Sequence, residues 1–411
     1  FVMRKRLLWG LMVFLSVSVL AGAQANGKLQ IHFIDVGQGD GALLISPQGE
    51  TVLFDGGVLN KCDKPLSYLQ QLGVTKIDYL VVSHYHSDHI GCTPQEFQEF
   101  PLQKDSIDRG FNYTTGVYND YVTAVGQHRV SVTHPGKEIA LDSSSPNPVK
   151  IKIVVVDGVP LNAPPIATDN ENDLSLAALV SFGRFRAEIG GDLSGVANVR
   201  HFGSTTIEYK DIESSVAPDV GPIDVYKVHH HCSAFSSNQT WLSQVTPTVA
   251  IVSVGDGNTY GHPAPECVQR LHAAGIQKSY WTEHGAGKVN PEPGLDVVGG
   301  NIIVEVPVPP ADTVFTVAYN DTQLDTYPVR QAASSSPGPG NNGPPNVPNG
   351  PKYAWSKNSK VYHYASCSYV TNISSKNLQT GSSPPRGKTL HQGCPVRHQN
   401  PETTDPSDLP Q

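Results

Sequence analysis

Three histidines and an aspartate lie within six residues of one another, at His84, His86, Asp88 and His89. They follow a short apolar run, residues 79–82, which predicts a β-strand that ends at the cluster. Histidine and aspartate are costly to bury without partners, so core packing does not explain why these types meet at a strand end. A polar loop with incidental histidines is the alternative. The residue types favour a metal site.

Two histidines at positions i and i+2 of an extended segment point to the same side, so His84 and His86 can bind one cation. A turn through Ser87 would direct Asp88 and His89 toward a second cation. Nitrogen and oxygen ligands in this mixture suit zinc, and at the harder end manganese or iron. The cluster therefore predicts a site for two divalent metals, with zinc the first choice and manganese the second.

The motif HYHSDH resembles the His-x-His-x-Asp-His signature of the metallo-β-lactamase fold hydrolases. The order of the neighbouring segments is similar to that in the branch that contains the extracellular nuclease-like domain of the bacterial DNA-uptake channel (ComEC-like). These segments are IHFIDVGQGDGALL (31–44), TVLFDGG (51–57), NDLSLAALV (172–180), EIGGDL (188–193), VYKVHHHCS (225–233) and VGDGNTYGHP (254–263). The resemblance covers residues 28–307 and implies an α/β fold, the αββα four-layer sandwich.

The resemblance also implies which side chains bind the metals. The first metal would be bound by His84, His86 and Asp192, and the second by Asp88, His89, His230 and the shared Asp192. Most relatives supply a further histidine to the first metal, but here the corresponding region reads Asn172-Asp173. We expect a weak first site, or one completed by water or by His128, His134 or His262.

Further residues are expected to act beside the ligands. Besides Asp88, the candidates for catalysis are His231 and His262, which would bind the leaving group or donate a proton to it, or would be structural histidines instead. Asp55, Asn172 and Ser233 would support the ligands from behind. Cys232 stands where the family has a glycine, so the backbone of that loop is open to question.

Apolar periodicity predicts elements on either side of the metal cluster. A helix over 63–73 ends at Gly73, and Cys62 and Cys92 flank this helix and the strand after it, so we expect them to form a disulfide. Residues 95–150 are poorly periodic and predict a variable insertion beside the pocket or a plain surface excursion. Strands are expected at 29–34, 42–46, 51–54, 149–156, 174–182, 185–189, 223–228, 248–254, 278–283 and 301–307, and helices at 238–243 and 264–274.

The first 25 residues have the pattern of a secretory signal peptide. Arg4, Lys5 and Arg6 precede an apolar run over 7–20, and small residues allow cleavage after Ala25. A retained membrane anchor is the weaker alternative because the apolar run is short for a bilayer span. The sequence holds no second run long enough to cross a membrane. We therefore expect a bacterial protein that is secreted or periplasmic, and this location permits disulfides among its six cysteines.

Charge divides the chain into an acidic and a basic part. The formal net charge is −8, of which the signal contributes +3 and residues 351–411 contribute +4, so residues 26–350 carry −15. An acidic surface repels phosphate backbones, which argues against tight general DNA binding by the domain over 26–330. Residues 331–351 are rich in Pro, Gly, Asn and Ser and predict a linker.

A small basic module is expected over 352–400, followed by a disordered tail over 401–411. His363, Cys367, Cys394 and His398 have spacings that suit a structural zinc, and a disulfide between the two cysteines is an equal alternative. The module could hold nucleic acid or an anionic wall polymer, or could be a solvated basic surface.

The resemblance favours a secreted phosphodiesterase that uses a hydroxide held between two metals, of the extracellular nuclease or phosphocholine-esterase type. Hydrolysis of a β-lactam or lactone ring is the second hypothesis, since this fold hosts many reactions. A non-enzymatic protein that binds the cell wall or DNA is the third.

Overall fold

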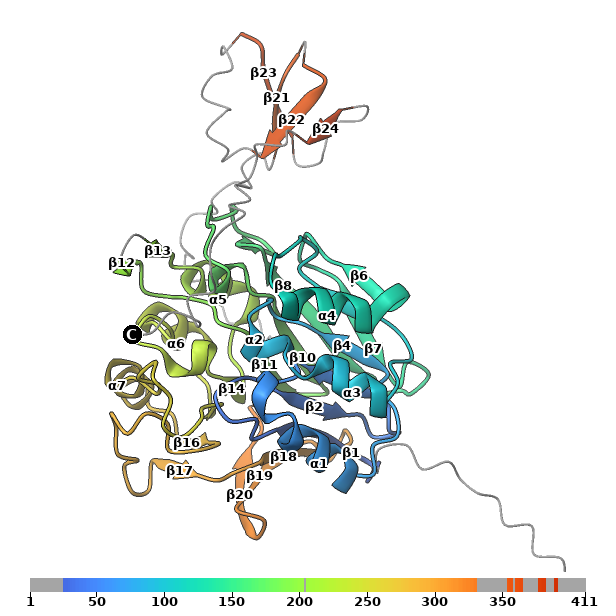
Figure 1. Cartoon of the computed structure of the whole chain (residues 1–411), viewed down its shortest axis with the longest axis vertical. Helices are drawn as coiled ribbons and strands as arrows, with labels where there is room; N and C mark the ends of the chain where they lie inside the picture. The colour runs from blue at the N-terminus through green and yellow to red at the C-terminus, as the bar shows by residue number, and fades with distance from the viewer. Residues whose placement is uncertain are drawn as a thin grey trace, which may run out of the picture.

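The computed structural model describes residues 25–202, 205–330, 353–357, 359–364, 376–381 and 388–390. Within these residues two nine-stranded sheets form the body of the molecule (Figure 1). The first sheet contains, in spatial order, β20 (Gln323–Pro328), β19 (Val314–Tyr319), β18 (Ile302–Pro307), β1 (Lys28–Phe33), β2 (Ala42–Ile45), β3 (Thr51–Phe54), β4 (Tyr79–Val81), β5 (Ser106–Asp108) and β6 (Arg129–Ser131).

The second sheet contains, in spatial order, β17 (Asp296–Val298), β16 (Lys278–Trp281), β15 (Val249–Val252), β14 (Val225–Lys227), β11 (Phe185–Gly190), β10 (Ala177–Phe182), β8 (Val149–Val156) and β7 (Glu138–Leu141). The short β9 (Val159–Pro160) pairs with β8. A separate hairpin joins β12 (Asn198–Phe202) to β13 (Thr205–Tyr209).

Helices cover the outer face of each sheet (Figure 1). Four accompany the first sheet: α1 (Asp63–Gln71), α2 (Ser87–Ile90), α3 (Thr93–Glu99) and α4 (Gly116–Val125). Three accompany the second: α5 (Glu213–Val220), α6 (Gln239–Val245) and α7 (Pro265–Ala273). Short 3-10 turns lie at η1 (Leu59–Lys61), η2 (Gly126–His128), η3 (Asn172–Leu174) and η4 (His229–Cys232).

Alternation along the strands explains the four layers. In β2, Leu44 faces the core between the two sheets, whereas Leu43 packs with the helices of the first sheet. In β15, Ile251 faces the core between the sheets, whereas Ala250 and Val252 pack against the helices of the second. Three separate apolar layers result, one between the sheets and one under each set of helices. The predicted αββα sandwich is confirmed.

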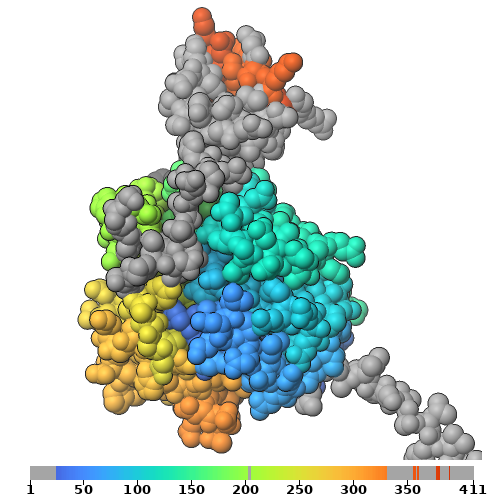
Figure 2. All heavy atoms as spheres, in the orientation of Figure 1, coloured from blue at the N-terminus to red at the C-terminus, as the bar shows by residue number. Residues whose placement is uncertain are grey.

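The two halves meet directly on the face shown in Figure 2, where blue N-terminal atoms adjoin yellow and orange atoms. The backbone N–H of Gly255 donates to the side-chain oxygen of Gln38 at 3.1 Å, and Lys64 of α1 pairs with Glu283. Cys62 and Cys92 form the predicted disulfide, which ties the start of α1 to the start of α3.

Residues 95–150 showed little periodicity in the sequence, but they contain most of α3 and all of β5, α4, β6 and β7. Helix α4 starts where the hydroxyl of Thr115 accepts a hydrogen bond from the backbone N–H of Tyr118. Tyr118, Tyr121 and Val125 then bury one face of the helix. Aromatic residues among Gly, Asn and Thr obscured this short helical pattern.

Several predictions fall outside the described residues. These are residues 1–24 of the predicted signal, the linker over 331–351, the tail over 401–411, and Cys367, Cys394 and His398. The described C-terminal pieces form a four-stranded sheet of β23 (Leu378–Gly381), β21 (Tyr353–Ser356), β22 (Val361–Tyr364) and β24 (Thr389–Leu390). His363 lies in β22, opposite Ala354. In the described part of the chain, no helix combines the length and the apolar character that a membrane crossing requires.

Candidate metal centre

The predicted ligands follow the carboxyl ends of strands in both sheets. His84 and His86 come after β4, Asp192 comes two residues after β11, and His230 and His231 come after β14. Since β3 runs parallel to β4, and β11, β14 and β15 run parallel to one another, the segments after these strands leave each sheet at one edge. The fold therefore brings residues from distant parts of the sequence to one place.

The loop from His84 to His89 is held from several sides. The backbone N–H of Tyr85 donates to Glu171, which also binds the buried Arg109 through two hydrogen bonds. The backbone N–H of Asp40 donates to the carbonyl of Asp88 at 3.1 Å. Residue 39 must be a glycine because a Cβ there would collide with that carbonyl.

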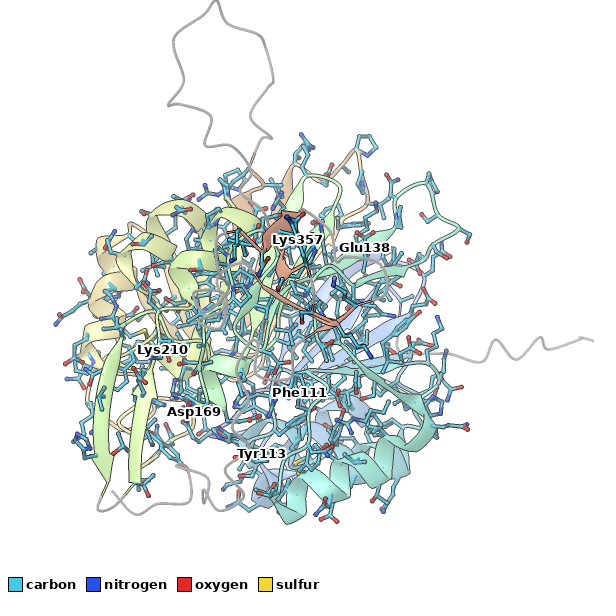
Figure 3. All side chains as sticks on the ribbon, turned by 90° about the horizontal axis from the view of Figure 1, so that it is seen from above. Phe111, Tyr113, Glu138, Asp169, Lys210 and Lys357 are labelled. Atoms are coloured by element: carbon cyan, nitrogen blue, oxygen red, sulfur yellow. A yellow bond between two sulfur atoms is a disulfide. The ribbon has the colours of Figure 1, made fainter. Side chains whose placement is uncertain are left out.

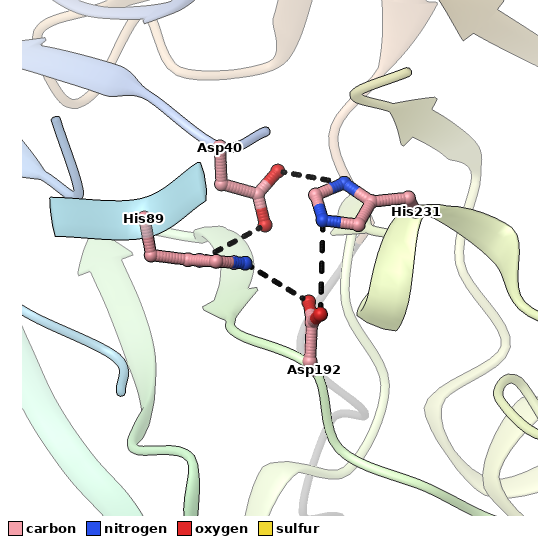
Figure 4. A group of neighbouring side chains, drawn as sticks. All are labelled: Asp40, His89, Asp192 and His231. Carbon is pink, nitrogen blue, oxygen red and sulfur yellow. Dashed lines mark ion pairs between the residues drawn. The ribbon is translucent and has the colours of Figure 1, made fainter. Parts of the chain in front are cut away.

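Asp40, His89, Asp192 and His231 form a compact buried group (Figure 4). One nitrogen or oxygen atom of each lies within 4.8 Å of the corresponding atoms of the others. The Nε2 atom of His89 lies 3.4 Å from Asp192 Oδ1, and the Nε2 atom of His231 lies 3.7 Å from Asp192 Oδ2. Asp88 Oδ2 faces the same two nitrogens, at 3.5 Å from His231 and 4.0 Å from His89.

Hydrogen bonds at the opposite ring nitrogens orient both imidazoles. The Nδ1 atom of His89 donates to Asp55 at 2.8 Å, and the Nδ1 atom of His231 donates to the carbonyl of Ser253 at 2.9 Å. In the neutral form that metal binding requires, with the proton on Nδ1, each ring would direct the lone pair of Nε2 toward Asp192. Asp40 faces the Nδ1 side of both rings, at 3.8 and 3.7 Å, so it lies behind them.

A second group of histidines, His84, His86 and His230, lies next to the first group. The Nδ1 atom of His84 lies 3.1 Å from the hydroxyl of Ser83 and 3.2 Å from that of Ser175, which leaves its Nε2 as the free ligand atom. The rings of His84 and His86 are 4.7 Å apart. The Nε2 atom of His230 lies 3.7 Å from Asp192 Oδ2.

The donor atoms fit bound cations. Within the described residues, the Nε2 atoms of His84, His89 and His231, with one oxygen each of Asp88 and Asp192, are buried and have no hydrogen-bond partner. Buried polar atoms normally find partners, so atoms of this kind that surround one carboxylate indicate a missing ligand. Imidazole nitrogens and carboxylate oxygens are the ligands that zinc and manganese accept.

Electrostatics also favours cations here. Burial lowers the pKa of His230 to about 4, so this ring is neutral at pH 7 and can bind a metal. Burial alone would raise the pKa of Asp192, but His231, His230 and His89 hold it well below its usual range. Asp192 therefore stays ionised beside the carboxylate of Asp88, and cations would balance this buried charge.

The loop that carries His230 and His231 has an uncommon backbone. His230, His231 and Cys232 have φ angles of +49°, +49° and +60°, in the left-handed region that favours glycine. Cys232 forms a disulfide with Cys267 of α7, which the sequence did not indicate. Residue 232 thus adopts a backbone conformation that favours glycine although it is a cysteine. The disulfide to Cys267 holds its side chain in place.

Residues 35–256, more than half of the chain, match the family model for the metallo-beta-lactamase superfamily. The chain belongs to this superfamily. ComE operon protein 3 of Bacillus subtilis is 24% identical over 266 residues, which cover 60% of this chain and 31% of that protein. Recombination protein 2 of Haemophilus influenzae is 28% identical over 249 residues, which cover 59% of this chain and 26% of that protein.

The chain spans less than a third of the length of either relative, and both agree with the ComEC-like resemblance. Among solved structures, the metallo-beta-lactamase fold protein YhfI from Bacillus subtilis is 12% identical with a TM-score of 0.38. That match covers 67% of this chain and 98% of YhfI.

The other predicted residues of this superfamily member lie close to the histidines. The Nδ2 atom of Asn172 is 3.4 Å from His230 Nε2, and the rings of His262 and His230 are 5.3 Å apart. Ser233 accepts a hydrogen bond from the backbone N–H of Phe235 at 3.3 Å and so closes the turn after the histidines. Asp55 also binds Ser83 through its backbone N–H and its hydroxyl, at 2.8 and 2.7 Å.

Two of the three histidines proposed to complete the first site, His128 and His134, have partners elsewhere. The Nδ1 atom of His128 lies 2.6 Å from the carbonyl of Lys104, and that of His134 lies 3.1 Å from the hydroxyl of Thr133. His262 remains beside the centre, next to His230.

Sequence reasoning missed Asp40 and Lys227, which form a buried ion pair behind the ligands. The signal was present, since Asp40 ends the segment DVGQGD, but a bend between strands explained the glycines equally well. His229 is also buried and lies between Glu213 and Glu188, at 2.9 and 3.2 Å. Two carboxylates occupy both of its nitrogens, so His229 supports the loop from behind.

Proposed function

We propose that this chain is a phosphodiesterase that depends on two divalent metals. Three histidines that converge on Asp192 carry the proposal: His89, His230 and His231. His84, His86 and His230 would bind the first metal, Asp88, His89 and His231 the second, and Asp192 both. When bound, the two cations supply a nucleophile at neutral pH and stabilise charge on the attacked group.

This assignment changes the roles that the sequence suggested for two neighbouring histidines, which were the second metal for His230 and the leaving group for His231. His231 is favoured for the second metal because its Nε2 faces Asp88 and Asp192 on the side of His89. His230 is favoured for the first because its ring lies beside Asn172. With His230 on that side, the first site gains the histidine that the sequence lacked at residues 172–173.

The surrounding residues orient the metal ligands, and one further histidine, His262, is proposed to contact the substrate. The carboxylate of Asp55 and the carbonyl of Ser253 fix the tautomers of His89 and His231, and the hydroxyl of Ser175 contacts Nδ1 of His84. Burial and the nearby histidines keep the pKa of His262 well below its usual value, so its ring is neutral at pH 7. A neutral imidazole beside the centre can hydrogen-bond the leaving group as the bond to it breaks.

Two observations support a phosphodiester over other substrates. The motif order resembles that of a nuclease-like domain, and one relative carries the name of recombination, a process that acts on DNA. Ring opening of a β-lactam remains the second candidate function, because the same carboxylate and histidines would serve it. A nuclease would cleave nucleic-acid polymers, whereas a phosphocholine esterase would release choline phosphate.

The test compares substrates in parallel. Full-length protein loaded with zinc or manganese is incubated with bis-p-nitrophenyl phosphate, an oligonucleotide and a chromogenic cephalosporin. We expect hydrolysis of the first two, and Asp192→Ala should abolish it together with binding of both metals. Asp219→Asn, at an aspartate that pairs with Asn162, serves as the control and should behave as wild type.

Cleavage of the cephalosporin alone would contradict the proposed substrate class. Wild-type turnover by Asp192→Ala would show that the bridging residue lies elsewhere. Metal analysis of refolded protein that finds no transition metal would contradict the site itself.

A further inference from the structure

Three tyrosines stand beside three different histidines of the centre. The ring centroids are 6.3 Å apart for Tyr113 and His86, 6.5 Å for Tyr209 and His230, and 5.9 Å for Tyr260 and His262. The tyrosines come from the segment before α4, the end of β13 and the segment before α7. The superfamily match assigns no role to them. Aromatic rings therefore flank three histidines of the centre.

The ring of Tyr209 begins a stack that leads outward. Phe235 lies on Tyr209 with ring centroids 4.4 Å apart and planes inclined by 25°. The guanidinium of Arg200, on β12, lies 5.8 Å from the centroid of Phe235. Tyr209 is buried, Phe235 is partly buried and Arg200 is exposed, so the stack runs from His230 to the surface.

Two members of the stack, Arg200 and Tyr209, belong to the β12–β13 hairpin. Figure 3 shows Lys210, which follows β13, apart from Phe111 and Tyr113. Arg200 places positive charge at the hairpin of a domain that is acidic as a whole, whereas Lys210 pairs with Glu208. Flat rings next to cations match a ligand that is both planar and anionic.

We propose that Tyr209, Phe235 and Arg200 form the subsite for an unpaired nucleotide next to the scissile phosphodiester, so that the substrate is single-stranded nucleic acid. The base stacks on the face of Phe235 opposite Tyr209, in place of the exposed side chain of Arg200, which binds the adjoining phosphate. Bases of a duplex stack on one another and cannot reach these rings. The proposal rests on the proposed phosphodiesterase function and names its substrate.

A quaternary ammonium such as choline also binds among aromatic rings. The guanidinium of Arg200 against Phe235 opposes this occupant, because two cations on one aromatic stack repel each other. The observations therefore favour the nucleotide.

The test measures binding apart from cleavage. The full-length zinc-loaded protein is titrated into a fluorescein-labelled oligothymidylate with phosphorothioate linkages, and into a hairpin duplex of the same length, while anisotropy is recorded. We expect the single strand to bind more tightly. Phe235→Leu should weaken that binding about tenfold, as expected for loss of one base–aromatic stack, and should reduce the preference over the duplex.

Arg200→Gln is a second variant at an exposed residue, and it should weaken binding while lowering the slope of log K against log salt by about 0.7. Tyr319→Leu is the matched control, since this partly buried ring packs on Tyr280 in the first sheet. It should leave affinity and preference unchanged.

Equal binding of single strand and duplex by the wild type, or unchanged affinity in Phe235→Leu, would overturn the subsite. Hydrolysis of p-nitrophenyl phosphorylcholine with a KM that Phe235→Leu raises, and no effect on oligonucleotide binding, would assign the rings to choline instead. If the oligonucleotide binds as expected but no phosphodiester is cleaved, the subsite stands and the proposed activity fails.

Discussion

Removal of the Cys232–Cys267 disulfide should damage the metal centre as well as the fold, unlike removal of Cys62–Cys92. The two disulfides span 35 and 30 residues, so chain entropy predicts that each stabilises the fold by about 4 kcal/mol, with a difference of only about 0.1 kcal/mol. The two disulfides differ in the backbone conformation of their cysteines: Cys92 has a φ of −95°, whereas Cys232 has a φ of +60°.

The left-handed conformation costs a residue with a Cβ about 1 kcal/mol, which glycine does not pay. Once the disulfide is gone, alanine at position 232 is free to relax toward negative φ, and the adjacent His231 would move with it. Glycine at 232 would keep the loop in place. We therefore expect the pair Cys232→Gly and Cys267→Ala to bind the second metal about fivefold more tightly than Cys232→Ala and Cys267→Ala.

The assay has two parts. Thermal unfolding in chelator should show similar losses of stability for Cys62→Ala with Cys92→Ala and for Cys232→Ala with Cys267→Ala. Competition with a zinc-binding dye should then show weaker metal binding in the second pair only. Equal loss of metal affinity in both pairs of variants, or no gain in metal affinity when residue 232 is glycine instead of alanine, would refute this prediction.

Three further predictions follow from other residues. Burial, with a smaller contribution from Asp55, raises the pKa of Glu96 well above 4.5, so the fold is most stable while this carboxyl is protonated and its stability falls as pH rises above 4.5. Glu96→Gln should therefore flatten the dependence of Tm on pH between pH 4.5 and 7. An unchanged pH profile of Tm would contradict the burial of Glu96 as a protonated acid. Asp55→Ala leaves His89 Nδ1 without its acceptor and should lower metal affinity about 10- to 100-fold by chelator competition, while wild-type affinity would show that this hydrogen bond does not orient the ring. Truncation at Asn346 removes the basic residues 351–411 and should slow polymer cleavage at low salt but not cleavage of small esters; equal slowing of both would rule out a tether.

Local sequence determined the parts of the site that lie close together in the chain. His84, His86, Asp88 and His89 are contiguous, so strand periodicity and ligand chemistry were enough to predict a metal loop after β4. Alternating apolar residues likewise predicted most strands, because each strand must bury one face or both. The Cys62–Cys92 pair could be predicted because it brackets one helix and one strand.

Tertiary structure decided the features that depend on backbone conformation or on distant partners. Three consecutive left-handed residues bring both His230 and His231 to Asp192, and neither helical nor strand periodicity describes such a turn. Asp40 lies behind His89 and His231 only because two sheets place their strand ends at one edge. Cys232 meets Cys267 through the packing of α7 on the second sheet, where no local pattern links the two residues. Contacts between residues far apart in the chain depend on how the sheets and helices pack, and the sequence carries that information only through the whole fold.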